Sequence, residues 1–297
     1  MLPKISIVVP NYNHAPFLKE RLETIFNQTY QNFEVILLDD ASTDNSLEIL
    51  QQYSKHSKVS YFIKNEVNSG SPFVQWKKGI DLASGDYIWI AESDDYCNLN
   101  FLEKILKHID SKTGLAYCAS INVNSKNEIL GINTWASELH NKRWNRDFTN
   151  SGSNEVKLYL KFRNTIPNAS SVVFKAEIVK KIEFPINMYF CGDWYIWLKI
   201  LEKGNITYLS EALNYFRKHE KSTRQIASLE REIDRFQEYM QIIKLNSSFF
   251  LRLKKMKNYN WILKEWEWKK EYFKKHSIFK LNLPIEFLLY YWTRIKL

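Results

Sequence analysis

The sequence has few cysteines and lacks the short motifs that mark several common enzyme classes. Its three cysteines, Cys97, Cys118 and Cys191, form no C-x-x-C pair, which argues against a disulfide framework or a zinc site and fits a reducing compartment. No G-x-G-x-x-G follows the first apolar run, and G-x-x-x-x-G-K-[ST], G-x-S-x-G and H-E-x-x-H are absent. Dinucleotide oxidoreductases, P-loop enzymes, serine hydrolases and zincins are therefore disfavoured.

Long hydrophobic runs are also missing. The basic start leads into the short run Ile5–Val9, which ends at Pro10, so we expect no secretory signal. The longest apolar candidate, residues 285–292, is eight residues long, whereas a membrane-spanning helix needs about 20. We therefore expect a globular chain that does not cross a membrane.

The positive charge is concentrated in the last quarter of the chain. Residues 1–220 carry 25 Lys and Arg against 25 Asp and Glu, whereas residues 221–297 carry 17 against 8. Within residues 250–297, basic and aromatic residues interleave as in helices that lie in a bilayer interface. Two interpretations stay open: this segment contacts an anionic membrane surface, or it is a helical appendage that packs on the rest of the protein. Nucleic acid is not an expected partner, because no recognition motif supports it.

The first hundred residues alternate apolar runs with amphipathic segments, which is typical of βα units and a mostly parallel sheet. The pattern predicts strands at 5–9, 33–38, 59–63 and 87–91, with helices at 17–26, 47–53 and 73–83. Further along it predicts helices at 101–109 and from 192, strands at 115–120, 129–132, 172–174, 206–209 and 213–216, and a polar loop at 137–153. We expect an α/β fold over residues 1–221, in halves 1–98 and 99–221, and a helical C-terminal region over residues 222–297.

Acidic residues follow two of the predicted strands. Asp39 and Asp40 end the second strand, and Glu92, Asp94 and Asp95 follow the fourth. Ligands of open α/β sheets bind at the carboxyl ends of the strands, and neighbouring strands lie only about 4.8 Å apart. We therefore expect the two acidic clusters to lie close together.

Three acids within four positions raise one another's pKa unless a cation or hydrogen-bond donors offset their charge. Oxygen ligands at the end of a strand suit Mg²⁺ or Mn²⁺, which usually keep a substrate phosphate in their coordination shell. The alternative is that the acids cap the helix near residue 100, but Glu92, Asp94 and Asp95 exceed what one cap requires. The cluster therefore predicts a metal site that holds a nucleotide diphosphate.

Other candidates are ambiguous when each is taken alone. Asp39-Asp40 fits either a ligand contact or an ordinary strand-to-helix turn. Asp193, at the start of a predicted helix, fits either a functional acid or an N-cap. Arg217 and His219 fit either a phosphate and metal contact or a solvated basic loop.

Three segments resemble the family 2 glycosyltransferases with the GT-A fold, in order and spacing. They are ISIVVPNYN at 5–13, LLDDASTD at 37–44, and ASGDYI at 83–88 running into Ser93-Asp-Asp95. The resemblance covers about residues 3–222. It implies a Rossmann-like nucleotide-diphospho-sugar transferase fold, and transfer of a sugar from a nucleotide diphosphate sugar with inversion at the anomeric carbon.

The resemblance also implies roles for the residues that bind the donor. Pro10, Tyr12 and Asp40 match the positions that hold the nucleotide base, with Tyr12 against the ring. Asp94 matches the position near the ribose, and Arg217 the position near the diphosphate. The implied donor is a nucleotide diphosphate sugar, with UDP as the expected nucleotide.

Roles in metal binding and catalysis follow in the same way. Asp95 and His219 match the residues that hold Mn²⁺ or Mg²⁺, and Asp193 matches the general base that deprotonates the acceptor hydroxyl. Such chemistry needs a divalent ion to stabilise the leaving diphosphate and a base within hydrogen-bond reach of the acceptor.

Departures from the family pattern leave the donor sugar and the acceptor open. Gln75-Trp76 replaces a frequent Arg-Asn, and Gly192 replaces a frequent Glu. The Gln-x-x-Arg-Trp element of processive synthases is absent, so addition of a single sugar is expected.

We expect a glycan or lipid-linked glycan acceptor of a bacterial surface, and a cytoplasmic enzyme that docks on the inner face of the membrane through residues 250–297. A nucleotidyltransferase of similar fold and a non-catalytic sugar- or membrane-binding module are the alternatives.

Overall fold

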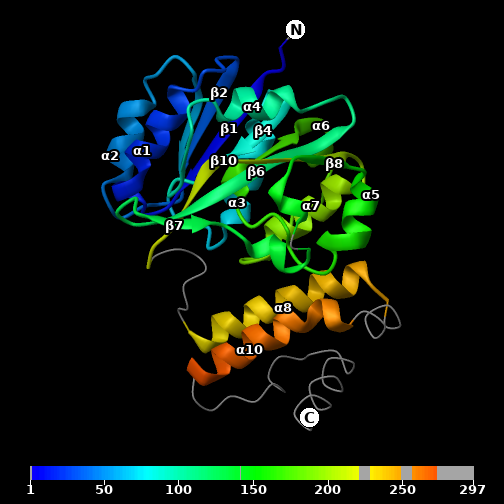
Figure 1. Ribbon diagram of the computed structural model, residues 1–297. Helices are drawn as coiled ribbons and strands as arrows, with labels where there is room; N and C mark the ends of the chain where they lie inside the picture. The colour runs from blue at the N-terminus through cyan, green and yellow to red at the C-terminus, as the bar shows by residue number, and fades with distance from the viewer. Residues whose placement is uncertain (1, 141, 221–227, 249–255, 273–297) are drawn as a thin grey trace.

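The computed structural model describes residues 2–140, 142–220, 228–248 and 256–272 of the 297-residue chain (Figure 1). The apolar run 285–292 and most of the basic segment 250–297 lie outside these residues, so the prediction of membrane contact stays a prediction. Within the described ranges, no helix has the length and apolar character needed to span a bilayer.

A central sheet organises the fold (Figure 1). Its strand order is β3-β2-β1-β4-β9-β6-β10-β5, with β7 paired to β6 and β8 paired to β10. The first four strands are parallel, and β9 runs antiparallel between β4 and β6, so the second half of the sheet is mixed. The strands are β1 Ile5–Asn11, β2 Phe33–Asp39, β3 Val59–Lys64, β4 Tyr87–Ile90, β5 Tyr96–Cys97, β6 Thr113–Asn124, β7 Ile129–Ile132, β8 Phe148–Asn150, β9 Val172–Lys175 and β10 Asn205–Lys218.

Helices cover both faces of the sheet because alternate residues of the buried strands point to opposite sides. Ile7 of β1 belongs to a core cluster shared with α1, α2 and α4, whereas Val8 belongs to the cluster shared with α3 and α7. The predicted α/β fold with flanking helices is confirmed. The helices are α1 Ala15–Phe26, α2 Ser46–Tyr53, α3 Pro72–Leu82, α4 Phe101–Lys107, α5 Gly152–Glu155, α6 Ala176–Val179, α7 Gly192–Leu201, α8 Leu229–Asn246 and α10 Asn260–Tyr272, with short turns of other helix types at 135–138, 143–145, 156–160, 169–171 and 256–259.

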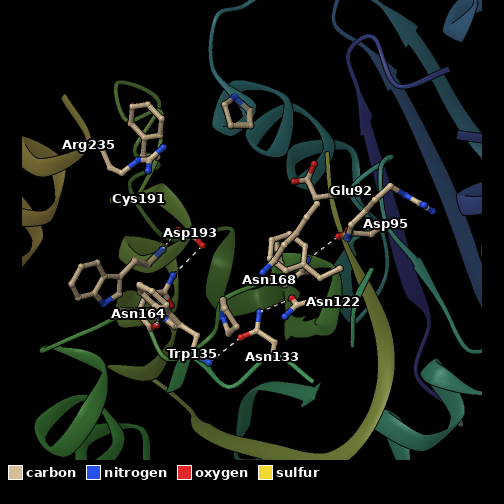
Figure 2. A pocket seen from close by; sticks show the side chains of 18 of the residues that line it. Glu92, Asp95, Asn122, Asn133, Trp135, Asn164, Asn168, Cys191, Asp193 and Arg235 are labelled. Carbon is tan, nitrogen blue, oxygen red and sulfur yellow. Dashed lines mark hydrogen bonds between the residues drawn. The ribbon is translucent and has the colours of Figure 1, made fainter. Parts of the chain in front are cut away.

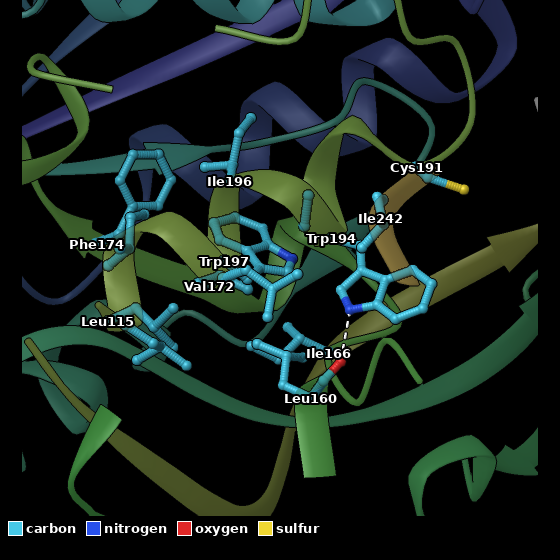
Figure 3. Close-up of a cluster of buried hydrophobic side chains, with 14 of the residues drawn as sticks. Leu115, Leu160, Ile166, Val172, Phe174, Cys191, Trp194, Ile196, Trp197 and Ile242 are labelled. Carbon is cyan, nitrogen blue, oxygen red and sulfur yellow. Dashed lines mark hydrogen bonds between the residues drawn. The ribbon is translucent and has the colours of Figure 1, made fainter. Parts of the chain in front are cut away.

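The C-terminal helices α8 and α10 continue the second core cluster. Ile242 of α8 is fully buried and lies near Trp194 of α7 (Figure 3). Trp194 Nε1 donates to the carbonyl oxygen of Leu160 at 2.7 Å, and the rings of Phe236 and Trp266 join α8 to α10 at 5.3 Å between centroids. Within the described residues, the helical region therefore packs on the sheet-bearing part of the chain, as the second interpretation predicted.

Two predictions about the second half of the chain were wrong. The expected separate strands 206–209 and 213–216 form one strand, β10, whose register with β6 shifts between Leu209 and Asn214. The polar residues there mark an irregularity within one strand, where we expected a turn. The expected loop 137–153 contains the short strand β8, and three residues are too few to show an alternating pattern.

Candidate active site

Helix α3 links the two acidic clusters at the carboxyl ends of β2 and β4. Gln75 Nε2 donates to Asp40 Oδ1 at 2.7 Å, and the next residue, Trp76, donates through Nε1 to Glu92 Oε1, also at 2.7 Å. Asp40 also accepts from the backbone N–H and hydroxyl of Ser69. The clusters share one edge of the sheet, with β1 between their strands. Gln75 and Trp76, which depart from the family pattern, thus each hold one acid of these clusters.

A pocket of about 740 Å³ lies in front of the β4 end, within the size range of ligand sites. Glu92 and Asp95 line it from the β4 end, and Asp193 lines it from α7 (Figure 2). Asp94, Arg217 and His14 also contribute to its wall. Of the residues predicted to hold the base, Pro10 is buried in β1, Asp40 is buried, and Tyr12 is 44% exposed. These three are not part of the pocket wall.

The acids after β4 have strongly perturbed pKa values. Burial raises the pKa of Glu92 to about 8, and the negative charge of Asp94 adds to this effect. Burial and Asp94 likewise raise the pKa of Asp95 to about 6. Burial also acts to raise the pKa of Asp94, but His14 and His219 outweigh it and lower that pKa below its usual value. The site therefore concentrates carboxylate charge on Asp94.

Asp94 lies with two histidines in an arrangement that suits a metal ion. Ligand atoms of His14, Asp94 and His219 all lie within 4.8 Å of one another. His219 Nε2 is 3.0 Å from Asp94 Oδ2, and His14 Nδ1 is 2.8 Å from the hydroxyl of Ser93. The contact with Ser93, which lies outside the cluster, is of the kind that orients an imidazole ligand. His14 was not predicted; its place directly after the β1 end was the available signal.

Asp95 has a different set of contacts. Its Oδ1 accepts the backbone N–H of Arg217 at 2.8 Å, and its Oδ2 accepts from Asn168 Nδ2 at 2.9 Å (Figure 2). The residue is buried. Both carboxylate oxygens therefore join β10 and the 169–171 turn region to the β4 end. Among the described residues, the cluster of possible metal ligands that contains Asp94 does not include Asp95.

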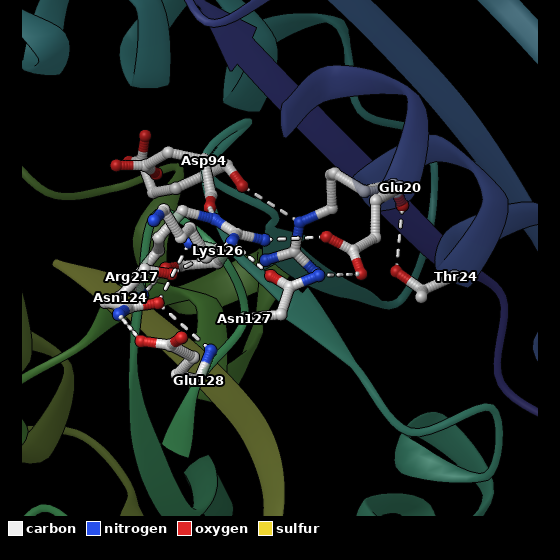
Figure 4. Close-up of polar contacts among 11 residues, drawn as sticks. Glu20, Thr24, Asp94, Asn124, Lys126, Asn127, Glu128 and Arg217 are labelled. Carbon is white, nitrogen blue, oxygen red and sulfur yellow. Dashed lines mark hydrogen bonds and ion pairs between the residues drawn. The ribbon is translucent and has the colours of Figure 1, made fainter. Parts of the chain in front are cut away.

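The side chain of Arg217 is buried in a polar network next to the acids (Figure 4). Its Nε donates to the carbonyl oxygen of Asp94 at 2.7 Å, and its Nη2 pairs with Glu20 at 2.7 Å. Its Nη1 donates to Asn127, and its guanidinium lies 4.6 Å from the ring centre of Phe17. A direct phosphate contact would require the guanidinium to leave this network. In this conformation Arg217 holds the Asp94–Asp95 segment in place.

Asp193 lies in the first turn of α7. The N-cap of this helix is Cys191, so the N-cap interpretation of Asp193 does not hold. Its Oδ1 accepts the N–H of Trp194 at 2.6 Å and its Oδ2 accepts from Asn164 Nδ2 at 3.0 Å. A Cβ at Gly192 would lie 2.6 Å from the ring of Phe73. Close packing of α7 on α3 therefore requires glycine at the position where many family members have Glu.

A residue of α8, Glu238, holds the loop that leads into α7. Its carboxylate accepts the backbone N–H groups of Tyr189, Phe190 and Cys191 at 2.7, 2.9 and 2.7 Å. Burial raises its pKa in spite of these three hydrogen bonds. Glu238 was not predicted, because an acid on an amphipathic helix usually faces solvent.

Comparison with known proteins assigns this chain to a family. Residues 6–169 match the family described as Glycosyl transferase family 2. A stretch of 95 residues is 44% identical to poly(ribitol-phosphate) beta-glucosyltransferase of Bacillus spizizenii, covering 31% of this chain and 15% of that protein. Over 216 residues the chain is 26% identical to the putative teichuronic acid biosynthesis glycosyltransferase TuaG of Bacillus subtilis, covering 72% and 79%. The chain thus spans most of TuaG but a small part of the first relative.

Two solved structures have a similar fold. TarS 1-349 of S. aureus in complex with UDP-GlcNAc has a TM-score of 0.61 at 22% identity, over 82% of this chain and 66% of that one. The mannosyltransferase PcManGT of Pyrobaculum calidifontis in complex with GDP-Man and Mn²⁺ has a TM-score of 0.57 at 17% identity, over 84% and 66%. At these identities the likeness establishes the fold alone.

Proposed function

The chain belongs to glycosyl transferase family 2, and from this premise we propose that it transfers a single sugar from a nucleotide diphosphate sugar to a hydroxyl group of a glycan. One observation carries the proposal: Asp94 and His14, two members of the cluster that they form with His219, line the same pocket as Asp193 with its fixed carboxylate. UDP is the favoured nucleotide, since the structurally similar TarS binds UDP and UDP-GlcNAc.

The acceptor that we propose is a bacterial surface glycan, free or linked to lipid. Relatives named for poly(ribitol phosphate) and for teichuronic acid support this class. A lipid-linked acceptor would place the enzyme at the inner face of the cell membrane, with residues 250–297 as the contact.

The donor set favours a transition-metal ion over Mg²⁺. His14, Asp94 and His219 offer two imidazole nitrogens and a carboxylate, whereas Mg²⁺ prefers oxygen ligands throughout. Mn²⁺ is the ion that we propose, since the structurally similar PcManGT is in complex with it. We therefore assign Asp94 and His219 to the metal, add His14, and place Asp95 behind them as a residue that positions the β4 end. When bound, the ion supplies Lewis-acid stabilisation of charge on the leaving diphosphate.

Asp193 is the proposed general base. Asn164 and the N–H of Trp194 fix its carboxylate, so it can accept the proton of an acceptor hydroxyl within hydrogen-bond reach. The oxygen then attacks the anomeric carbon opposite the diphosphate, and one displacement inverts that centre. Pro10, Tyr12 and Asp40 remain the proposed base-binding residues, at the β1 and β2 ends.

A donor-cleavage assay tests the proposal. The full-length chain is incubated with a series of UDP- and GDP-sugars, with and without MnCl₂, and the products are separated. Release of nucleoside diphosphate in the presence of Mn²⁺ is the expected result. Release of pyrophosphate in a nucleotidyltransferase reaction with a sugar phosphate and nucleoside triphosphate, or no turnover of any substrate, would contradict it.

A further inference from the structure

The pocket extends from the proposed metal ligands to helices that lie outside the matched family segment. That segment ends at residue 169, whereas α8 and α10 begin at Leu229 and Asn260. Six residues of these two helices line the pocket: Arg235, Tyr239, Trp261, Glu265, Trp268 and Lys269. One continuous cavity therefore joins the acids after β4 to a wall from the C-terminal region.

This wall lies on the side of the proposed base. The ring of Tyr239 in α8 is 6.3 Å from the ring of Trp194, the residue after Asp193. Glu238 of the same helix holds the loop that precedes α7. An inverting displacement brings the acceptor to the face of the sugar opposite the diphosphate, which is the face that the base serves. The acceptor must therefore approach from the Asp193 side of the pocket.

We propose that α8 and α10 form an acceptor subsite in which a sugar ring of the acceptor glycan stacks on Trp268. This inference rests on the proposed function and names the surface that its acceptor uses. Trp268 lines the pocket and is 59% exposed, and Lys269 Nζ lies 4.8 Å from its ring centre, so a sugar would stack on the ring face that this ammonium group leaves open. Other aromatic residues of the wall have structural contacts: Trp135 Nε1 donates to the carbonyl oxygen of Asn164 at 2.8 Å, and Trp261 Nε1 donates to that of Phe162 at 3.0 Å.

The mixed chemistry of the wall favours a sugar over an acyl chain. A pyranose presents an apolar C–H face and a rim of hydroxyl groups, which matches an aromatic ring flanked by polar side chains. The same pocket also presents the polar side chains of Glu265, which lies three residues before Trp268 in α10, and of Asn133 and Asn164. The pocket wall also carries two ionic groups, Lys269 and Arg235. Both pair with Glu232, at 3.3 and 3.4 Å. An acyl chain would displace water from these groups and offer them no hydrogen bond in return.

Binding of defined sugars to the full-length chain tests the subsite without relying on turnover. The probes are methyl and octyl glycosides of glucose, N-acetylglucosamine and mannose, with octanol as the sugar-free control, measured by saturation-transfer NMR with UDP and MnCl₂ present. We expect at least one methyl glycoside to bind wild type and Trp268→Ala to weaken that binding about tenfold, the loss of one stacking contact. Trp268→Phe, which keeps an aromatic face, should restore most of it.

A matched control is Tyr61→Ala, which removes an exposed aromatic of β3, 44% exposed and outside the pocket wall; its binding should equal that of wild type. The inference is overturned if no methyl glycoside binds wild type, if Trp268→Ala binds as tightly as wild type, or if octanol displaces the octyl glycosides fully. Absence of nucleoside diphosphate release in the donor assay contradicts the proposed function separately, because sugar binding is measured without it.

Discussion

The two ends of the parallel strands each hold a glutamate, buried at Glu34 and half-buried at Glu92, and the pKa values of the two carboxyl groups are shifted in opposite directions. At the amino end, Glu34 of β2 accepts from Ser6, Ser60 and Lys4 and from both the N–H and the hydroxyl of Ser84, at 2.6–2.9 Å. Burial acts to raise its pKa, but these hydrogen bonds lower it to about 2. At the carboxyl end, Glu92 accepts from Trp76 Nε1, and burial raises its pKa to about 8.

The difference separates an acid that stabilises the fold from an acidic cluster that we propose to lie at a metal site. Glu34 joins β1, β2, β3 and the segment before β4, and donors from the chain itself satisfy it. Glu92, Asp94 and Asp95 share fewer donors and repel one another, which costs stability that an external cation would recover. Perturbed carboxyl groups in a pocket are typical of functional sites. Variants at the two ends should therefore affect activity and stability in opposite ways.

The largest expected effect is on activity at the carboxyl end. Asp94→Asn should lower Mn²⁺-dependent donor turnover by about 10²-fold or more, because it removes the carboxylate of the proposed metal site. Its thermal stability without metal should equal or exceed that of wild type, since the raised pKa values of Glu92 and Asp95 arise partly from Asp94.

Asp95→Asn is the matched control for this prediction. It should retain Mn²⁺-dependent UDP binding, measured by calorimetry with and without the ion, because Asp95 faces Arg217 and Asn168. The reverse pattern, with metal dependence lost in Asp95→Asn and kept in Asp94→Asn, would restore the assignment made from the sequence.

The next effect concerns the base across the pocket. Asp193→Asn should lower turnover by about 10²-fold, the usual scale for loss of a general base, while UDP binding with Mn²⁺ stays within the range of wild type. Steady-state kinetics and calorimetry on the same preparation check both statements. Turnover equal to wild type would reduce Asp193 to a structural residue of the α7 first turn.

The carboxyl end was easier to predict from the sequence than the wall that faces it. Strands β1 to β4 and their acids were found because apolar runs and clustered carboxylates are local patterns. His14 was missed because its place after the β1 end is a weak signal for a single histidine, and its partner His219 lies about 200 residues away. Glu238 and Trp268 were missed as site residues because only tertiary packing of α8 and α10 brings them to the pocket. Local pattern thus predicts the sheet edge, whereas the opposite wall depends on long-range contacts.

At the amino end the expected effect is on stability. Glu34→Gln should lower the free energy of unfolding by about 1–3 kcal/mol at pH 7, because buried donors that now face a carboxylate would lose a charged acceptor. Its folded pKa of about 2 lies below the unfolded value near 4.5. The stability that it contributes is therefore present above pH 4.5 and is lost as the pH falls from about 4.5 to 2.

Urea unfolding at a series of pH values checks this sign. Wild type should lose stability over that interval more steeply than Glu34→Gln, and donor turnover at pH 7 should be the same for both. Glu66→Gln, which changes an exposed glutamate, is the control and should follow wild type. Equal pH profiles for all three proteins would mean that the hydrogen bonds to Glu34 contribute no pH-dependent stability.

The smallest effect is expected at Glu238, which combines features of the structural acid and of the acids in the pocket. Glu238 is satisfied by three backbone N–H groups, as Glu34 is by its donors, yet it holds the loop before the proposed base. Glu238→Gln keeps one acceptor oxygen but turns an amide NH₂ toward the loop, so we expect a turnover about fivefold lower with UDP affinity unchanged, a loss of about 1 kcal/mol. Glu230→Gln, on the exposed face of the same helix, is the matched control. If Glu238→Gln lowers stability while turnover of the folded protein stays at the wild-type value, Glu238 belongs with Glu34 as a purely structural acid.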